Sequence, residues 1–340
     1  DNVVLAPGSN IGSDATGDGL MPKNSMGISV KGDCVIERNI VGSTNIGINL
    51  VEKGDITINN NRIYVIPNAL IDSYGIYSHG LSNLTVTDNR LYFIGNTDGT
   101  VVNNGVRIEG DDDEDEPAPA TNIVVSGNTF DLQLPSVDVS YDPDTWAATT
   151  MSEGIVFYYC EDLKFTNNRV DLTYNNFTTA YGYDSLYAVS VRSDAYTFGE
   201  VQSKHVMIAD NEINIDGHST TYAVYVCADD FSVLFNNITS TSETYLAYGI
   251  DVDGPCAEDL VAGNDIVARA PLATYGIYSY QYMGAIENVS YPANTIDVTG
   301  YASAGMEIVE CNPEITNNGI LARGNYTYGI IASIRDEGVL

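Results

Sequence analysis

A short motif recurs along almost the whole chain and restricts the fold more than any other feature. The pentapeptide Tyr-Gly-Ile-Tyr-Ser occurs at residues 74–78 and again, letter for letter, at residues 275–279. Looser copies, each with Gly or Ala at the second position, recur at intervals of 20 to 49 residues. Self-similarity at such intervals is typical of solenoids, in which each repeat packs on its neighbours. With the second residue taken as an anchor, the copies lie at Gly27, Gly47, Gly75, Gly105, Gly154, Ala188, Ala223, Gly249, Gly276, Gly305 and Gly329.

Each repeat contains two segments with the period of a β-strand. The first and third residues after the anchor are apolar, as in Ile28 and Val30 or in Ile250 and Val252, which predicts a strand with one buried face. The second segment reads apolar-x-apolar-x-x-Asn-x-apolar-x-apolar, as at residues 84–93, and predicts two short strands that meet at a corner. A helical repeat would need a period of 3.6 residues, and a propeller blade would need more residues than most of these intervals contain.

The corner between the two short strands carries Asn in every complete repeat except the first, where we assign the position to Arg38. Asn tolerates the left-handed backbone conformation, and its amide can bond both the backbone and an equivalent Asn one repeat away. The sequence therefore predicts an internal amide ladder. Its members are Asn61, Asn89, Asn128, Asn168, Asn211, Asn236, Asn264, Asn294 and Asn318.

These patterns resemble the right-handed parallel β-helix repeats of pectate lyases, NosD-type periplasmic proteins and large archaeal adhesin-like surface proteins. The resemblance covers residues 26–331 and implies an all-β solenoid of about 10–11 coils with three strands per coil. We expect residues 1–25 to form a start or cap segment and residues 26–340 to form one solenoid. Loop insertions are predicted at residues 111–121, 134–150, 174–185 and 193–204.

Composition excludes some classes of function. The 340-residue chain has 14 basic and 46 acidic residues and a net charge of −32, so it repels nucleic-acid phosphates and anionic membrane surfaces. No run of 18 apolar residues is present that would insert into a membrane. Such acidity suits an extracellular or cell-surface protein, although it also serves solubility alone.

Two features could hold a metal ion or a disulfide bond. The acidic run Asp111, Asp112, Asp113 and Glu114 is a candidate Ca²⁺ site, but it lacks the spaced ligand pattern of Ca²⁺ loops, and like-charge runs are more often solvated. No other cofactor is expected. Among the five cysteines, Cys227 and Cys256 alone fall in neighbouring repeats, which makes them the candidate disulfide; the alternative is that the cysteines are small buried hydrophobic residues.

An enzyme would need catalytic groups that converge. Polygalacturonase-type β-helix hydrolases combine Asn-Thr-Asp, Asp-Asp, Gly-His-Gly and Arg-Ile-Lys motifs on adjacent coils. The partial matches at residues 96–98 and 229–230 fall at different corners several coils apart. His79 stands in Ser-His-Gly rather than Gly-His-Gly, and residues 107–109 lack the lysine, so the set is not assembled. A lyase would need acidic residues near a catalytic Arg or Lys, but none aligns with Arg62 or Arg90, so these are interpreted as surface arginines.

Tyrosines and sequons offer further candidate sites. Tyrosines precede six of the anchors and follow three of them by two residues, so they could bind sugars or a subunit, or could stack on one another along the solenoid. Five N-x-S/T sequons permit glycosylation, a number that chance explains. Their asparagines are Asn83, Asn176, Asn237, Asn288 and Asn325.

The leading hypothesis from the sequence is a non-catalytic structural or adhesive protein of the cell surface, such as a surface-layer or filament subunit. Its predicted partners are copies of itself or surface glycans. The last repeat, at residues 328–340, is incomplete, which favours head-to-tail stacking of copies or continuation into further repeats. The alternatives are a polysaccharide lyase or glycoside hydrolase of the β-helix type and, third, a carbohydrate-binding module.

Overall fold

The computed structural model describes residues 2–6, 25–51, 54–67, 72–96, 101–111, 117–138, 140–141, 148–150, 152–178, 184–193, 202–254, 259–280, 288–309 and 312–333. These residues form strands and turns and contain no helix. Accordingly, none of them lies in a helix that could cross a membrane.

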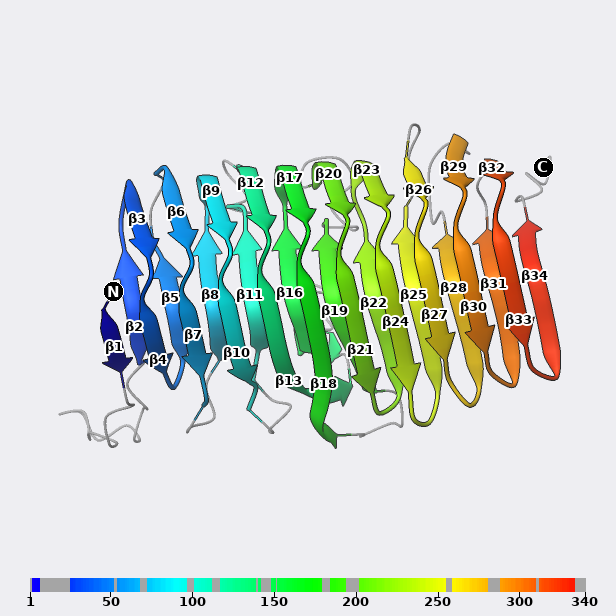
Figure 1. Cartoon of the computed structure of the whole chain (residues 1–340), viewed down its shortest axis with the longest axis horizontal. Coiled ribbons are helices and arrows are strands. Elements are labelled where there is room, and N and C mark those ends of the chain that lie inside the picture. The colour runs from blue at the N-terminus through cyan, green and yellow to red at the C-terminus, as the bar shows by residue number, and fades with distance from the viewer. Residues whose placement is uncertain are drawn as a thin grey trace.

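The strands form three rows that run the length of an elongated shaft (Figure 1). The chain passes from the first row to the second, then to the third, and returns to the first one coil further along. Each strand pairs in parallel with the equivalent strand of the neighbouring coils, so equivalent residues stack in columns. The chain is therefore a right-handed parallel β-helix with three strands per coil.

The first row, which carries the anchors, comprises β2 (Met26–Val30), β5 (Ile46–Leu50), β8 (Ser73–His79), β11 (Asn103–Glu109), β16 (Ser152–Tyr158), β19 (Asp184–Arg192), β22 (Thr220–Val226), β25 (Leu246–Asp253), β28 (Ala273–Tyr280), β31 (Ala302–Val309) and β34 (Tyr326–Ser333). The second row comprises β3 (Cys34–Glu37), β6 (Ile56–Asn59), β9 (Ser82–Thr87), β12 (Ala120–Ser126), β17 (Cys160–Thr166), β20 (Lys204–Ala209), β23 (Asp229–Leu234), β26 (Leu260–Ala262), β29 (Asn288–Pro292) and β32 (Asn312–Thr316). The third row comprises β1 (Val3–Ala6), β4 (Ile40–Ser43), β7 (Arg62–Val65), β10 (Arg90–Ile94), β13 (Thr129–Asp138), β18 (Arg169–Thr178), β21 (Glu212–Gly217), β24 (Asn237–Ser242), β27 (Asp265–Arg269), β30 (Thr295–Thr299) and β33 (Gly319–Arg323). The strands β14 (Ser140–Tyr141) and β15 (Ala148–Thr150) form a separate antiparallel pair.

The core is a set of aliphatic and aromatic columns between the three rows. One column runs through the first residue after each anchor, and its members from Ile48 to Met306 are 0% exposed. Phe165 stacks at 6.4 Å on Phe130 and meets Phe157 edge-on, so aromatic residues fill the middle of the shaft. Burial of these columns supplies the main stabilisation of the fold.

The anchor itself points inward, beside the first apolar residue of the strand. A Cβ added to Gly47 would lie 2.5 Å from the carbonyl oxygen of Gly75, and one added to Gly249 would lie 2.6 Å from that of Gly276. Backbones of successive coils approach closely at this column, which explains why the repeat tolerates only Gly or Ala there. Two consecutive inward residues also interrupt the alternation of the strand, a feature that simple period-two reasoning does not predict.

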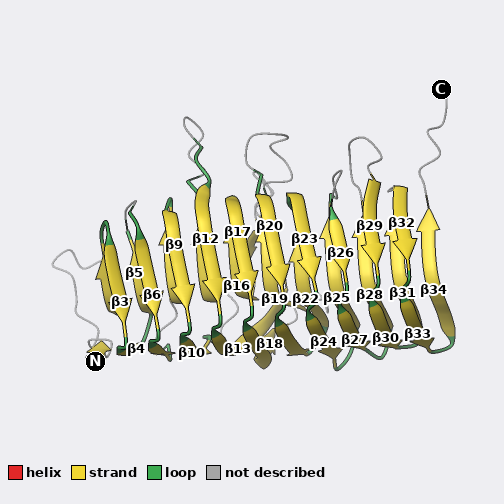
Figure 2. Cartoon of the chain, turned by 45° about the horizontal axis from the view of Figure 1, so that its top comes forward, coloured by secondary structure: helices red, strands yellow, loops and turns green. Residues whose placement is uncertain are grey.

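The predicted start segment and insertions are described only in part. Within residues 1–25, β1 pairs in parallel with β4, so the third row begins at Val3. The predicted insertions at 134–150 and 174–185 begin as extensions of β13 and β18, which pair with each other beyond a bulge at Leu134. In the insertion at 111–121, Asp111 forms an antiparallel bridge with Ala118, and most of the insertion at 193–204 lies outside the described residues; Figure 2 shows the strands from which these segments leave.

Candidate functional site

The amide ladder occupies the corner between the second and third rows. Asn168 is typical: its Nδ2 donates to the Val125 carbonyl oxygen at 2.9 Å and to Asn211 Oδ1 at 3.2 Å, while its Oδ1 accepts from the backbone and side-chain nitrogens of Asn128, both at 3.0 Å. Each amide thus joins its own coil to both neighbours. The same contacts connect all nine corner asparagines from Asn61 to Asn318.

The assignment of the first corner to Arg38 is wrong by one residue. Asn39 Nδ2 donates to Asn61 Oδ1 at 3.1 Å, and Asn2 Nδ2 donates to Asn39 Oδ1 at the same distance, so the ladder extends to the first described coil. The left-handed conformation also falls one residue earlier than expected, because it belongs to the residue before each ladder Asn, as in Arg38 (φ 56°) and Asn60 (φ 53°). The ladder Asn is therefore selected for its amide contacts, and its predecessor makes the turn.

Tyrosines on the outer face of the first row stack on one another. The rings of Tyr187, Tyr222, Tyr248 and Tyr275 lie in sequence with centroids 4.4, 4.6 and 4.8 Å apart and planes within 13° of parallel. Such spacing matches the separation of neighbouring parallel strands, about 4.8 Å. Mutual stacking thus covers the ring faces along this stretch, and a sugar ring has no flat surface to lie on between them.

The tyrosines that follow the anchors do not form a second ladder. Tyr225 and Tyr278 stand two coils apart with Asp251 between them in the register of the sheet. Their rings instead meet the stacked column edge-on, Tyr225 against Tyr187 at 5.9 Å and Tyr278 against Tyr248 at 5.7 Å. The result is a continuous aromatic layer with hydroxyl groups and ring edges toward solvent.

A charged pair is buried beside this layer. Arg192 Nε lies 2.5 Å from Glu153 Oε1, and the Glu153 side chain is only 3% exposed. The guanidinium carbon also lies 4.9 Å from the Tyr187 ring centroid and 4.8 Å from that of Tyr225, within the range of a cation–π contact. Burial opposes ionisation of the guanidinium, but Glu153 and the two tyrosines outweigh it and raise the pKa of Arg192. Arg192 Nη2 is buried and has no hydrogen-bond partner.

Two carboxyl groups extend the same surface. Asp251 and Asp253 both point outward from β25, and Asp253 Oδ2 accepts a hydrogen bond from the Tyr225 hydroxyl at 3.0 Å. Burial, reinforced by the negative charge of Asp253, raises the pKa of Asp251 to about 8. Burial also raises the pKa of Asp253 and, two coils from Asp251, that of Glu307. We call the group Tyr187, Arg192, Tyr225, Tyr248, Asp251, Asp253 and Tyr278 the carboxyl–tyrosine cluster.

A smaller network of the same kind lies three coils toward the N-terminus. Arg107 Nε lies 2.5 Å from Glu109 Oε2, and the Tyr77 hydroxyl donates to Glu109 Oε1 at 2.6 Å. Tyr77 in turn packs against Tyr74, with ring centroids 4.7 Å apart. Because Arg107 and Glu109 neutralise each other, this network is balanced in charge.

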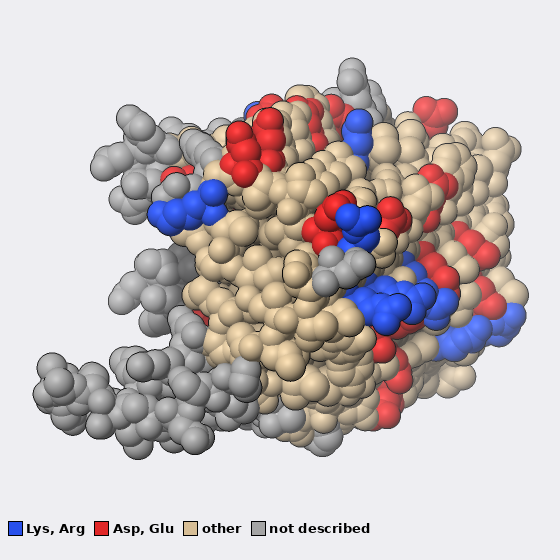
Figure 3. All heavy atoms as spheres, turned by 60° about the vertical axis from the view of Figure 1, so that its left-hand side comes forward, with Lys and Arg blue, Asp and Glu red and all other residues tan. Residues whose placement is uncertain are grey.

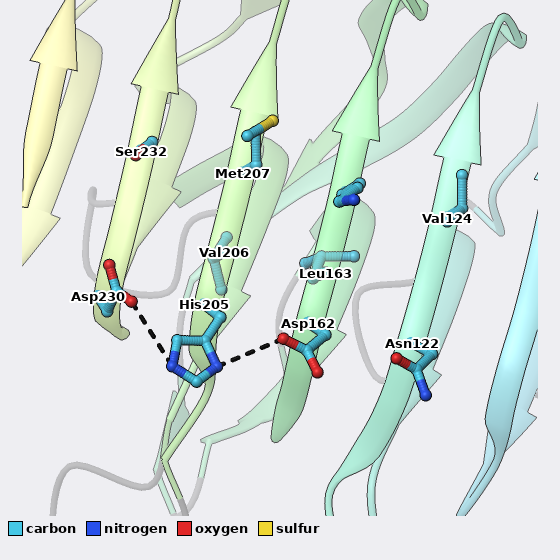
Figure 4. Close-up of a pocket in the computed structure, with 10 residues that line it drawn as sticks. Asn122, Val124, Asp162, Leu163, His205, Val206, Met207, Asp230 and Ser232 are labelled. Carbon is cyan, nitrogen blue, oxygen red and sulfur yellow. Dashed lines mark ion pairs between the residues drawn. The ribbon is translucent and has the colours of Figure 1, made fainter.

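The outer face of the second row carries a shallow groove of about 400 Å³ (Figure 4). Its centre is His205, whose Nδ1 lies 3.4 Å from Asp162 Oδ1 and whose Nε2 lies 3.6 Å from Asp230 Oδ2. All three residues have positive φ, and Asn122 continues their column. About half of each of these three side chains is exposed, so their interactions are solvated and contribute little energy.

Other charged residues lie around the sides of the shaft, while the N-terminal end that Figure 3 turns forward shows few in its described part. Arg62 and Arg90 are neighbours in register, whereas Arg169 is separated from them by Thr129 and pairs with Asp171 and Glu212. No group of three His, Cys, Asp or Glu residues in the described ranges is arranged to hold a metal ion.

Several predicted site residues fall partly or wholly beyond the described ranges. Of the acidic run, only Asp111 is described, so Asp112, Asp113 and Glu114 stay a predicted Ca²⁺ site. Burial raises the pKa of the Cys227 thiol to about 11. Cys256 lies outside the described residues, so the Cys227–Cys256 disulfide stays a prediction. The side chains of four sequon asparagines, Asn83, Asn176, Asn237 and Asn325, are exposed; that of Asn288 is not described.

The partial hydrolase motifs do not come together. His79 ends β8 in the first row, and Asp229 and Asp230 begin β23 in the second row four coils away. Asn96 is described, but the rest of its motif is not. Glu109, the last residue of the match at 107–109, lies beside His79 in register on the first row, whereas Asp229 and Asp230 lie on another face, so the set is not assembled.

The structure and its surface define the class of the protein: an acidic parallel β-helix with an internal amide ladder and a cluster of carboxyl and tyrosine side chains on one outer face. In comparison with known proteins, the chain matches no protein-family model, no curated protein and no solved structure.

Proposed function

We propose that the chain is a non-catalytic structural or adhesive module of an extracellular surface, as in a cell-surface layer or filament. The observation that carries this proposal is the continuity of the shaft. Amides, aliphatic side chains and tyrosines each find their partners in the next coil, from Asn2 at one end to Asn318 at the other. Because these groups bond to and stack on their equivalents in the next coil, the coils hold one another in place and the shaft is stiff.

The two ends of the described solenoid support assembly of copies end to end. Ile330 is 46% exposed, although it belongs to the inward column in which its neighbour Met306 is 0% exposed. At the opposite end of the same column, Ile28 is only partly buried. Stacking one copy on the next would place Ile330 against Ile28, continue the column, and pair strand edges that are otherwise open among the described strands.

Assembly can be tested by electron microscopy and analytical ultracentrifugation of the purified chain. We expect filaments or end-to-end oligomers, and we expect Ile330→Asp to abolish them because it places a charge in the column. Leu321→Asp is the matched control, since Leu321 lies on β33, the strand just before β34, but faces outward and is 48% exposed. A monomer that persists at high concentration would contradict end-to-end assembly.

An extracellular location agrees with the net charge of −32 and with the exposed sequon asparagines. Surface glycans are the second proposed class of partner. The alternative functions, a β-helix polysaccharide lyase or hydrolase and a carbohydrate-binding module, are favoured by the pair Asp251 and Asp253. A screen of neutral and uronate glycans for new reducing ends or unsaturated products separates turnover from binding.

A further inference from the structure

The carboxyl–tyrosine cluster contains acidic groups to which the described structure gives no direct ion pair. Glu153 neutralises Arg192, but Asp251 makes no hydrogen bond or ion pair within the described structure, and Asp253 accepts only the Tyr225 hydroxyl. Glu307, two coils from Asp251, also has no partner among the described residues. Carboxyl groups held partly out of water without partners cost folding free energy, which points to a role other than stability.

These groups are accessible as well as partly desolvated. Asp251, Asp253 and Tyr278 are neither buried nor fully exposed, so each presents part of its surface to a ligand. The column of Asp251 lies three residues along the strand from the stacked tyrosines, with two inward residues between them, and the register places Tyr225 on one side of Asp251 and Tyr278 on the other. Donors and acceptors therefore alternate along the shaft at the coil spacing of about 4.8 Å.

We propose that this face binds a neutral saccharide chain laid along the shaft, with Asp251, Asp253 and the Tyr278 hydroxyl holding its hydroxyl groups. The proposal specifies the glycan partner suggested above and rests on that part of the proposed function, not on end-to-end assembly. It names a site that the repeat pattern does not show, because the residues differ from coil to coil.

The chemistry of the cluster selects a neutral polyol over an anionic ligand. A sugar hydroxyl donates and accepts, which suits a surface where carboxylates accept and phenols donate. Uronates are disfavoured because the one cation in the cluster, Arg192, is already paired with Glu153. The stacked tyrosines expose ring edges rather than faces, so binding depends on hydrogen bonds more than on ring stacking.

The protonation state of Asp251 also affects how the face would bind a saccharide. With its pKa near 8, Asp251 is largely a neutral carboxylic acid at pH 7 and can donate a hydrogen bond to a saccharide oxygen, while Asp253 accepts one. Above pH 8 both carry negative charge, and the donor is lost. We therefore expect affinity to fall between pH 7 and pH 9. The titratable groups around Asp251 are Tyr248 and Asp253 on its own strand, Tyr222 and Tyr225 on β22 and Cys227 just after it, Tyr275, Tyr278 and Tyr280 on β28, Arg192 on β19 and Glu307 on β31.

The test uses the full chain and a panel of oligosaccharides read by glycan array and calorimetry. Neutral cello-, xylo-, manno- and malto-hexaoses are the probes; chitosan oligomers and oligogalacturonates are the cationic and anionic comparisons. We expect at least one neutral series to bind and the anionic oligogalacturonates to bind at least tenfold more weakly. A preference for chitosan oligomers or for oligogalacturonates would overturn the proposal.

Variants separate the site from the fold. Asp251→Ala and Asp253→Ala should each weaken binding about tenfold or more, whereas Asp251→Asn, which keeps a neutral donor, should bind within about threefold of the parent and lose the decline at pH 9. Asp265→Asn on the third row is the matched control, since this exposed carboxylate lies on another face. Circular dichroism and filament assays on the same variants show whether fold and assembly persist. Unchanged binding in folded Asp251→Ala and Asp253→Ala would sink the assignment, and would leave end-to-end assembly untouched.

Discussion

Replacing one central member of the amide ladder is the most direct test of what holds the coils in register. Asn168 is 2% exposed, and its side chain makes four hydrogen bonds, to Val125, Asn211 and twice to Asn128. Asn168→Ala removes all four and deprives the backbone N–H of Asn128 and the carbonyl of Val125 of these partners. With about 1 kcal/mol per hydrogen bond and about 1–3 kcal/mol for a buried group left unpaired, we expect a loss of about 3–5 kcal/mol.

The assay is urea denaturation followed by far-ultraviolet circular dichroism, with the transition midpoint and slope both fitted. Asn237→Ala is the control, because Asn237 is an exposed neighbour of the ladder residue Asn236; its effect should stay within about 0.5 kcal/mol. Asn318→Ala, at the last described corner, removes three hydrogen bonds from a half-buried site and should cost about 1–2 kcal/mol.

The decisive result is the relative size of the stability losses in these three variants. If Asn168→Ala costs less than 1 kcal/mol, or no more than Asn318→Ala, the ladder does not stabilise the stack in the way its geometry indicates. Because solenoid repeats unfold as coupled neighbours, a break at the centre should also broaden or split the transition, whereas a break at the end should not.

Three further predictions concern the first row. Gly276→Ala should destabilise the chain by about 1–3 kcal/mol in urea denaturation, because its Cβ would lie 2.5 Å from a carbonyl oxygen of the next coil. The control is Gly329→Ala, whose Cβ meets nothing within 4 Å, and it should change stability by less than about 1 kcal/mol. Arg192→Ala should cost about 3–5 kcal/mol in urea denaturation by leaving Glu153 buried and unpaired, and adding Glu153→Gln should recover part of this loss; a double variant no more stable than the single one would refute the pairing. Asp251 has a pKa of about 8 in the folded state against 3.8 in the unfolded state, so between about pH 4 and pH 8 the folded state keeps a proton that the unfolded state has released. The free energy of unfolding should therefore fall as the pH rises through this range. Asp251→Asn should flatten this slope and be the more stable protein at pH 8.5, and parallel pH profiles of the two proteins would contradict the raised pKa.

The repeat made the solenoid predictable because its strongest signals are local and recur in every coil. An anchor that must be Gly or Ala, apolar residues one and three positions later, and a corner Asn each reflect one column of contacts. Since all copies obey the same geometry, the columns align even when loops change the interval between them, as between Asn89 and Asn128, 39 residues apart. The fold class and the ladder members follow from that alignment.

The wrong assignments fall at corners where two adjacent residues both fit the repeat pattern. At the first corner, Arg38 and Asn39 are adjacent, and only the stacking register shows that Asn39 joins the ladder. The left-handed residue also could not be assigned from composition, because Asn, Asp, Gly, Arg, Phe and Ala all occupy that position, as Phe235 (φ 54°) and Ala293 (φ 60°) show. Stacking enforces the turn there more strongly than residue preference does.

The carboxyl–tyrosine cluster was not predictable in the same way. Arg192 and Glu153 are 39 residues apart in sequence and sit at different positions of their repeats, so no periodic pattern links them. Asp251 occupies a position that is Tyr in the next repeat, and its neighbours could be named only after the coils were aligned. Substitutions at outward positions that break the repeat are the available signal: a column of Tyr, Asp, Tyr and Glu from Tyr225 to Glu307 departs from simple stacking.

Ionic strength separates the two proposals for this chain, because they depend on charge in opposite ways. A molecule of net charge −32 resists the approach of a second copy. End-to-end assembly through the apolar column should therefore strengthen as salt is added and the screening length falls to about 8 Å at physiological ionic strength. A neutral saccharide feels no such repulsion, and its affinity should stay within about twofold between 20 and 300 mM salt. Assembly that weakens with salt, or saccharide binding that collapses with it, would show that surface ion pairs rather than core stacking or hydrogen bonds make the contact.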